Sequence, residues 1–194
     1  NGIARTFQNI RLFKSATVLE NVMTGFHCKT KTGMFNVIFN YRKCMQEEAE
    51  CREKALEILR FLGLEDVKNL EARNIPYGHQ RLLEIGRALA TSPKLLLLDE
   101  HTAALDPATA EKVLELTKSI VAEKKITCLM VTHNMHQALE LGNRTLMMDS
   151  GRIVFDVKGE ERSRMTVDDL LEKFRENAGK NLDNDRILLS KVEK

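Results

Sequence analysis

The chain has 194 residues, of which 43% are hydrophobic and 30% are charged, and its formal net charge is +2. These values are typical of one folded domain, exclude a fully disordered chain and show no basic excess that would indicate a nucleic-acid partner. The four cysteines form no C-x-x-C pair, which favours free thiols in the cytoplasm. We expect neither a membrane span, which needs ~20 apolar residues, nor a signal peptide.

The first half of the chain predicts one strand and then three helices. Residues 3–7 have the pattern of a strand already under way, so we expect the sequence to begin inside a larger unit. Thr17 and Glu20 form a capping-box pattern, which marks the start of a helix. Apolar residues recur at helical spacing in the three predicted helices, which span 17–27, 46–64 and 79–91.

The segment KLLLLDE, residues 94–100, predicts a buried strand that ends in two acids. A short apolar run after Pro93 is typical of a strand buried on both faces, and Asp99 and Glu100 follow it directly. Asp106 and Pro107 then have the pattern of an N-cap and first helical residue, which predicts a helix to about residue 123.

The remaining elements alternate in the same way. Residues 126–133 predict a second strand, β-branched and mostly apolar, that ends at His133, and a short helix over 134–141 follows, with Gly142 as its C-cap. The other predicted elements are a hairpin of 144–149 with 152–157 and a helix capped by Thr166 and Asp169. Alternating strands and helices predict a parallel sheet covered on both faces.

Ligands bind such sheets beyond the carboxyl ends of the strands, where Asp99, Glu100 and His133 are expected to meet. Because successive side chains alternate across a strand, the two acids should have different roles. We expect Asp99 to hold Mg²⁺ through its water shell, Glu100 to orient an attacking water and His133 to bond a γ-phosphate. His133 and His136 also have the spacing of a metal pair, but no third ligand lies nearby in the sequence.

Five segments resemble, in order, the motifs of ATP-binding cassette (ABC) ATPases. They are a Q-loop at 6–9 (TFQN), the signature motif and helix at 75–89, a Walker B strand at 94–100, a D-loop at 103–106 (AALD) and a switch-histidine strand at 131–133. Residues 2–25 and Pro76 resemble branched-chain amino-acid importers in particular. The later part, with His101 in place of the usual Pro, resembles other amino-acid or small-solute importer cassettes.

The resemblance implies an α/β fold, the P-loop NTPase core with a parallel sheet, together with a small helical subdomain over about 15–92. Residues 93–157 would form the remaining core, and 158–194 a C-terminal helix and tail. The resemblance further implies a subunit that couples hydrolysis of Mg²⁺-bound ATP to solute uptake. This subunit would bind a transmembrane permease on the inner face of the membrane and pair with a second cassette.

The resemblance also implies the role of each matching residue. Glu100, His133 and Gln8 would be catalytic, and Asp99 with Gln8 would serve the metal. The following residues would act on the nucleotide across the dimer: Pro76, Tyr77, Gly78, His79, Gln80 and Asp106. Pro76 brings neither a hydroxyl nor an N–H group to that contact. The apolar cluster at 34–41 is either core or part of the groove where the permease docks.

The phosphate-binding loop G-x-x-x-x-G-K-[ST] occurs nowhere in the 194 residues. In the family order this loop precedes the Q-loop, so we expect a cassette truncated at its N-terminus, with apolar surface exposed. The chain alone is predicted to be inactive. The alternative is a relative without a P-loop that docks or scaffolds without hydrolysis.

Overall fold

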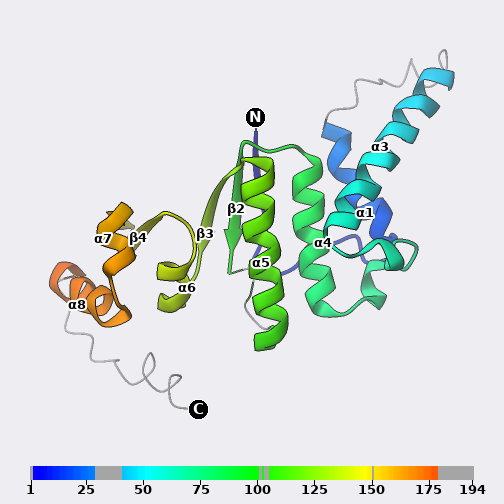
Figure 1. Ribbon diagram of the computed structural model, residues 1–194. Coiled ribbons are helices and arrows are strands. Elements are labelled where there is room, and N and C mark those ends of the chain that lie inside the picture. Colours follow the sequence, from blue (N-terminus) through cyan, green and yellow to red (C-terminus); the bar gives the residue numbers. More distant parts are fainter. Residues whose placement is uncertain (1, 29–40, 101, 103–104, 150, 179–194) are drawn as a thin grey trace. The chain divides into compact units, whose positions relative to one another are not determined.

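The computed structural model describes residues 2–28, 41–100, 102, 105–149 and 151–178 (Figure 1). They divide into two compact units, Asn1–Val131 and Thr132–Lys194, which are described separately. The apolar cluster expected at 34–41, the first half of the AALD segment and His101 before it lie outside the described side chains.

The first unit is built around a parallel sheet, as predicted, and in the described residues this sheet has three strands in the order β1-β2-β3. These strands are β1 (Ile3–Arg5), β2 (Leu95–Asp99) and β3 (Thr127–Val131). Leu97 lies opposite Arg5 on one side and opposite Leu129 on the other. This register brings the carboxyl ends of all three strands to one edge of the sheet.

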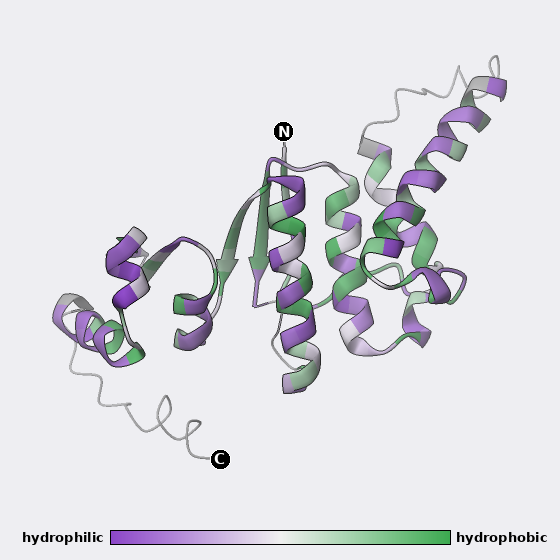
Figure 2. Cartoon of the chain, in the orientation of Figure 1, coloured by the Kyte–Doolittle hydropathy of each residue, from purple (hydrophilic) through white to green (hydrophobic). Residues whose placement is uncertain are grey.

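Only one face of this sheet is well covered, so the expectation of cover on both faces is wrong for the described part of this unit. Ala4, Leu96 and Leu98 are buried in a core that also contains residues of four helices. On the opposite face, Ile3 is 66% exposed and Val131 is 45% exposed. Figure 2 shows the apolar character of strands β2 and β3. The leucine run therefore has one fully buried face and one half-buried face.

The helices of the first unit follow the predicted order, with shifted ends. They are α1 (Val18–Thr24), α3 (Tyr41–Phe61), α4 (Tyr77–Ala90) and α5 (Pro107–Lys124), with short 3-10 turns at Gly25–Cys28, Glu65–Val67 and Ala72–Asn74. The capping box of Thr17 and Glu20 is confirmed. A Cβ on Gly86 would lie 2.7 Å from Cδ1 of Leu62. A glycine there allows α4 to pack closely against the end of α3.

The described residues of the second unit form a two-stranded antiparallel hairpin and three helices. They are α6 (Met135–Glu140), β4 (Arg144–Asp149), β5 (Arg152–Lys158), α7 (Gly159–Arg164) and α8 (Val167–Ala178). The C-cap of α6 is Leu141 rather than Gly142, which follows it with φ = 73°. Helix α7 was not predicted, because its charged sequence has no apolar repeat. It is anchored by buried Arg162, which donates hydrogen bonds to the Thr145 hydroxyl and to the Leu141 carbonyl.

Candidate functional site

The two acids at the end of β2 have different partners, as the alternation of side chains predicts. The Asp99 carboxylate forms an ion pair with Arg5 of β1, with an Nη2–Oδ2 distance of 2.8 Å. The Glu100 carboxylate accepts a hydrogen bond from the Gln8 side-chain amide, with an Nε2–Oε2 distance of 3.0 Å. The structure therefore brings Gln8, Asp99 and Glu100 to the same edge of the sheet.

The backbone of Glu100 adopts an unusual conformation. Its φ is 41°, in the left-handed region that favours glycine, and its N–H donates a hydrogen bond to the Val131 carbonyl at 3.0 Å. A non-glycine residue in this region costs on the order of 1–3 kcal/mol and persists where the surrounding structure fixes it. The end of β3 thus helps to fix the carboxylate at the point where β2 leaves the sheet.

His133 belongs to the second unit, so its meeting with Glu100 stays a prediction. The strand β3 ends at Val131 and not at His133 as expected. Thr132 begins a local turn here, because its hydroxyl accepts a hydrogen bond from the Asn134 N–H at 3.0 Å. Asn134 in turn caps α6 by accepting from the Gln137 N–H at 3.1 Å. His133 is exposed between these two capping groups.

The signature residues 76–80 form the start of α4. Pro76 is the N-cap, and no side-chain hydrogen bond caps this helix end. Tyr77 is 42% exposed. The side-chain amide of Gln80 donates to the Ile75 carbonyl at 3.0 Å, and the Nδ1 atom of His79 is buried without a hydrogen-bond partner. A helix start of this kind directs backbone N–H groups and the positive end of the helix dipole outward.

Gly78 allows α4 to approach α5 closely. A Cβ at this position would lie 2.4 Å from Cγ2 of Thr109, which is closer than real Cβ contacts come. Asp106 lies beside this contact and caps α5 by accepting a hydrogen bond from the Thr109 N–H at 3.0 Å. The hydrogen bonds from Thr109 hold the pKa of the Asp106 carboxyl below its usual value. Asp106 thus has a capping role in addition to the role across a dimer that we predict.

The donor atoms at the sheet edge suit Mg²⁺ bound mainly through water. Mg²⁺ keeps several waters and takes one or two carboxylates together with phosphate oxygens. Asp99 offers a half-buried carboxylate, and the Gln8 amide oxygen remains available because the amide nitrogen faces Glu100. Among the described residues, no three His, Cys, Asp or Glu side chains group as a metal site. These residues therefore fit a metal shared with a phosphate better than a metal enclosed by protein.

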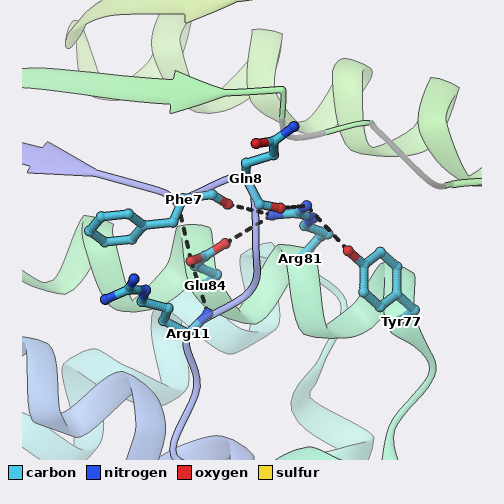
Figure 3. A network of polar contacts seen from close by, with 6 residues as sticks. All are labelled: Phe7, Gln8, Arg11, Tyr77, Arg81 and Glu84. Carbon is cyan, nitrogen blue, oxygen red and sulfur yellow. Dashed lines mark hydrogen bonds and ion pairs between the residues drawn. The ribbon is translucent and has the colours of Figure 1, made fainter.

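A buried ion pair on α4 was missed in the sequence. Arg81 and Glu84 have side chains that are 2% exposed each, and both contact the backbone that follows β1 (Figure 3). The sequence feature that could have predicted this pair is two opposite charges three residues apart, next to the apolar residues Leu82, Leu83 and Ile85. Arg5 was also missed as the partner of Asp99.

Comparisons with known proteins agree with this geometry. The family model described as "ABC transporter" matches residues 1–103. The chain is 40% identical over 174 residues to the "Tyrosine transport ATP-binding protein" of Clostridioides difficile (strain R20291), which covers 89% of this chain and 66% of that protein. It is 33% identical over 150 residues to the "High-affinity branched-chain amino acid transport ATP-binding protein LivG" of Escherichia coli (strain K12), covering 77% of this chain and 59% of the relative.

A solved structure shows the same fold. It is the ADP conformation of an ATP-binding cassette of an ABC transporter, with a TM-score of 0.70 and 34% identity over 89% of this chain and 68% of that one. The parallel sheet with its acidic edge and the uncapped helix start are thus those of a nucleotide-binding P-loop NTPase domain. The chain belongs to the ABC transporter family of ATPases. It spans 59% and 66% of the lengths of the two curated relatives named above.

Proposed function

We propose that the chain is part of the ATP-binding subunit of an ABC importer, in which hydrolysis of Mg²⁺-bound ATP drives uptake of a small solute. The contact of Gln8 with Glu100 is the observation that carries this proposal. It joins the Q-loop residue to the acid that would orient the attacking water, over 92 positions of sequence. An amino acid is the proposed solute, because the two curated relatives described above are named for the transport of tyrosine and of branched-chain amino acids.

Each site residue has a proposed role in this reaction. Mg²⁺ would neutralise charge on the phosphates of the nucleotide when bound. Asp99 would orient the waters of the metal, Glu100 would orient and polarise the attacking water, and Gln8 would hold Glu100 in place. His133 would donate a hydrogen bond to the γ-phosphate.

The signature residues are proposed to act across a dimer. The start of α4, formed by residues 76–80, would direct its backbone N–H groups toward nucleotide held by a second cassette. Asp106 would link the two sites. The membrane partner would be a permease. Among the helices that the structure describes, none has the length and apolar character needed to cross a membrane.

The exposed face of the sheet suits a covering segment. Ile3, Leu129 and Val131 are each at least 43% exposed on this face, and in the described part of the chain β3 pairs only with β2. We propose that the P-loop-bearing part of a cassette packs here and brings the phosphates to Glu100. Because the 194 residues contain no P-loop, we expect no ATP turnover from this chain alone.

ATP hydrolysis by two proteins tests this proposal. The first is the 194-residue chain, and the second is the same chain fused to the P-loop-bearing segment of the Clostridioides difficile relative. We expect hydrolysis in the presence of Mg²⁺ only from the fusion, and a fusion whose P-loop lysine is replaced by Ala serves as the matched control. A folded fusion that binds ATP without hydrolysing it would contradict the proposal and support a docking module.

A further inference from the structure

Arg81 and Glu84 form a buried ion pair, and a buried ion pair needs further polar partners. They lie three residues apart on α4, with an Nη1–Oε2 distance of 3.3 Å and side chains that are 2% exposed. Removing two charges from water costs several kcal/mol per ion unless hydrogen bonds compensate for the lost solvation. Compensation on this scale requires additional polar partners.

Those partners are backbone groups of residues 7–11. Arg81 donates from Nη1 to the Phe7 carbonyl at 2.7 Å and from Nη2 to the Gln8 carbonyl. The Oε1 atom of Glu84 accepts from the N–H groups of Phe7 and Arg11, each at 3.4 Å. The pair therefore holds both carbonyls and amides of a segment that lies more than 70 positions away in the sequence.

These contacts determine where the Gln8 side chain lies. Figure 3 shows the Gln8 backbone carbonyl facing Arg81, while the side chain of Gln8 points away from it. That side chain is the one that donates to Glu100. Because Arg81 binds the Gln8 carbonyl, the Gln8 side chain lies on the opposite side of the backbone and faces the end of β2.

The same helix carries the signature residues. Tyr77, in the first turn of α4, accepts a hydrogen bond from Nη2 of Arg81 at 3.2 Å, and the Arg81 guanidinium lies 5.5 Å from the centre of the Tyr77 ring. Charge-assisted hydrogen bonds are stronger than neutral ones and geometrically specific for arginine. Residues 7–11 and the start of α4 are thus joined through one guanidinium.

We propose that Arg81 and Glu84 are positioning residues that clamp segment 7–11 to α4. The clamp keeps Gln8 in contact with Glu100, and a displacement of the segment moves the signature residues 76–80 with it. Its value for catalysis rests on the proposed function. The clamp itself exists in the chain without nucleotide and can be measured there.

A purely stabilising role makes a different prediction from positioning. Replacing a buried ion pair by apolar residues of similar size is often neutral or stabilising, whereas removing one partner leaves an unpaired charge. The double variant Arg81→Met with Glu84→Leu should therefore keep the fold and lose the clamp. Glu84→Gln is a second, nearly isosteric variant, and Tyr77→Phe is a matched control that leaves every contact to segment 7–11 intact.

Two NMR measurements on the 194-residue chain test the clamp. The first is hydrogen exchange of the Phe7 and Arg11 amides, which we expect to be about tenfold faster in Glu84→Gln and in the double variant. The Thr6 amide, which donates to the Leu97 carbonyl at 2.9 Å, and the Tyr77→Phe variant should show unchanged exchange. Equal acceleration at Thr6, Phe7 and Arg11 would indicate general destabilisation and overturn the proposal.

The second measurement follows the Gln8 side-chain amide resonance. In the wild-type chain this resonance should shift on Glu100→Ala, and in the double variant we expect that response to be lost. A purely structural pair would leave the response unchanged, and that result would overturn the proposal.

If a fused cassette fails to hydrolyse ATP while both NMR results hold, the proposed function fails and the clamp stands. If the fusion is active, Glu84→Gln should lower kcat and leave KM for ATP unchanged.

Discussion

The side chains of Gln8 and Glu100 are joined by a hydrogen bond of 3.0 Å between the end of β1 and the end of β2. Both residues lie just beyond the carboxyl ends of neighbouring parallel strands, where ligands of α/β proteins bind. Asp99, one position earlier, is held instead by Arg5. The two adjacent acids thus have different partners: Glu100 bonds to an amide and Asp99 to a guanidinium. This difference agrees with the different roles that we propose for them.

Gly78→Ala should destabilise the first unit. The added methyl group would lie 2.4 Å from Cγ2 of Thr109, so α4 and α5 would have to move apart. Overpacking of this kind costs roughly 1–3 kcal/mol, which urea denaturation would measure. Thr109→Ser removes that Cγ2 and keeps the hydroxyl, so the double variant should recover most of the loss. A double variant no more stable than Gly78→Ala would show that the contact is not the cause.

The cap of α5 should make stability depend on acid pH through Asp106. Hydrogen bonds from Thr109 lower the pKa of this carboxyl in the folded chain, so the unfolded chain binds more protons as the pH falls. The contribution of Asp106 is fully present above the unfolded pKa of about 3.9 and is lost as the pH falls through the lower folded pKa. Asp106→Asn keeps a capping side chain but does not titrate. Thermal denaturation between pH 2 and pH 6 should show a smaller loss in Asp106→Asn than in the wild type, and parallel curves would refute this assignment.

The Cys128 thiol should react slowly in the folded chain. Burial raises its pKa to about 11, so at pH 8 about one thiol in a thousand is the reactive thiolate. A variant that retains only this cysteine, with Ser at positions 28, 44 and 51, would isolate its reaction with a disulfide reagent. We expect at least a tenfold lower rate in the folded state than in denaturant. Equal rates in the two states would show that β3 is open to solvent at this residue.

The sequence predicts those parts of the fold that local patterns determine. The capping boxes at Thr17 and Thr166, the proline start of α5 and the parallel pairing of the strands are confirmed. Each follows from residues close together in sequence, because a cap or a buried strand depends mainly on its own side chains. The partners of Asp99 and Glu100 depend on the register between neighbouring strands, and the local sequence pattern does not determine that register.

The missed features are those made by tertiary contact. Arg81 and Glu84 appear in the sequence as two charges on a helix, and nothing near them shows that both bind the backbone of residues 7–11. The unpredicted helix α7 depends in the same way on Arg162, whose partners come from residues before the hairpin and within it. Cover on both faces of the sheet was expected from the leucine run, but burial of a strand depends on elements outside that strand.

The most direct measurement of the central claim is the rate of ATP hydrolysis by the P-loop-restored fusion with and without Glu100→Gln. The amide removes the charge that would polarise the attacking water and keeps the size of the side chain. Loss of a general base or water-orienting group typically lowers the rate by about 10²–10⁴, so we expect kcat to fall by that factor with ATP affinity preserved. A fusion carrying Glu100→Gln that hydrolyses ATP as fast as the unmodified fusion would contradict the assignment of Glu100.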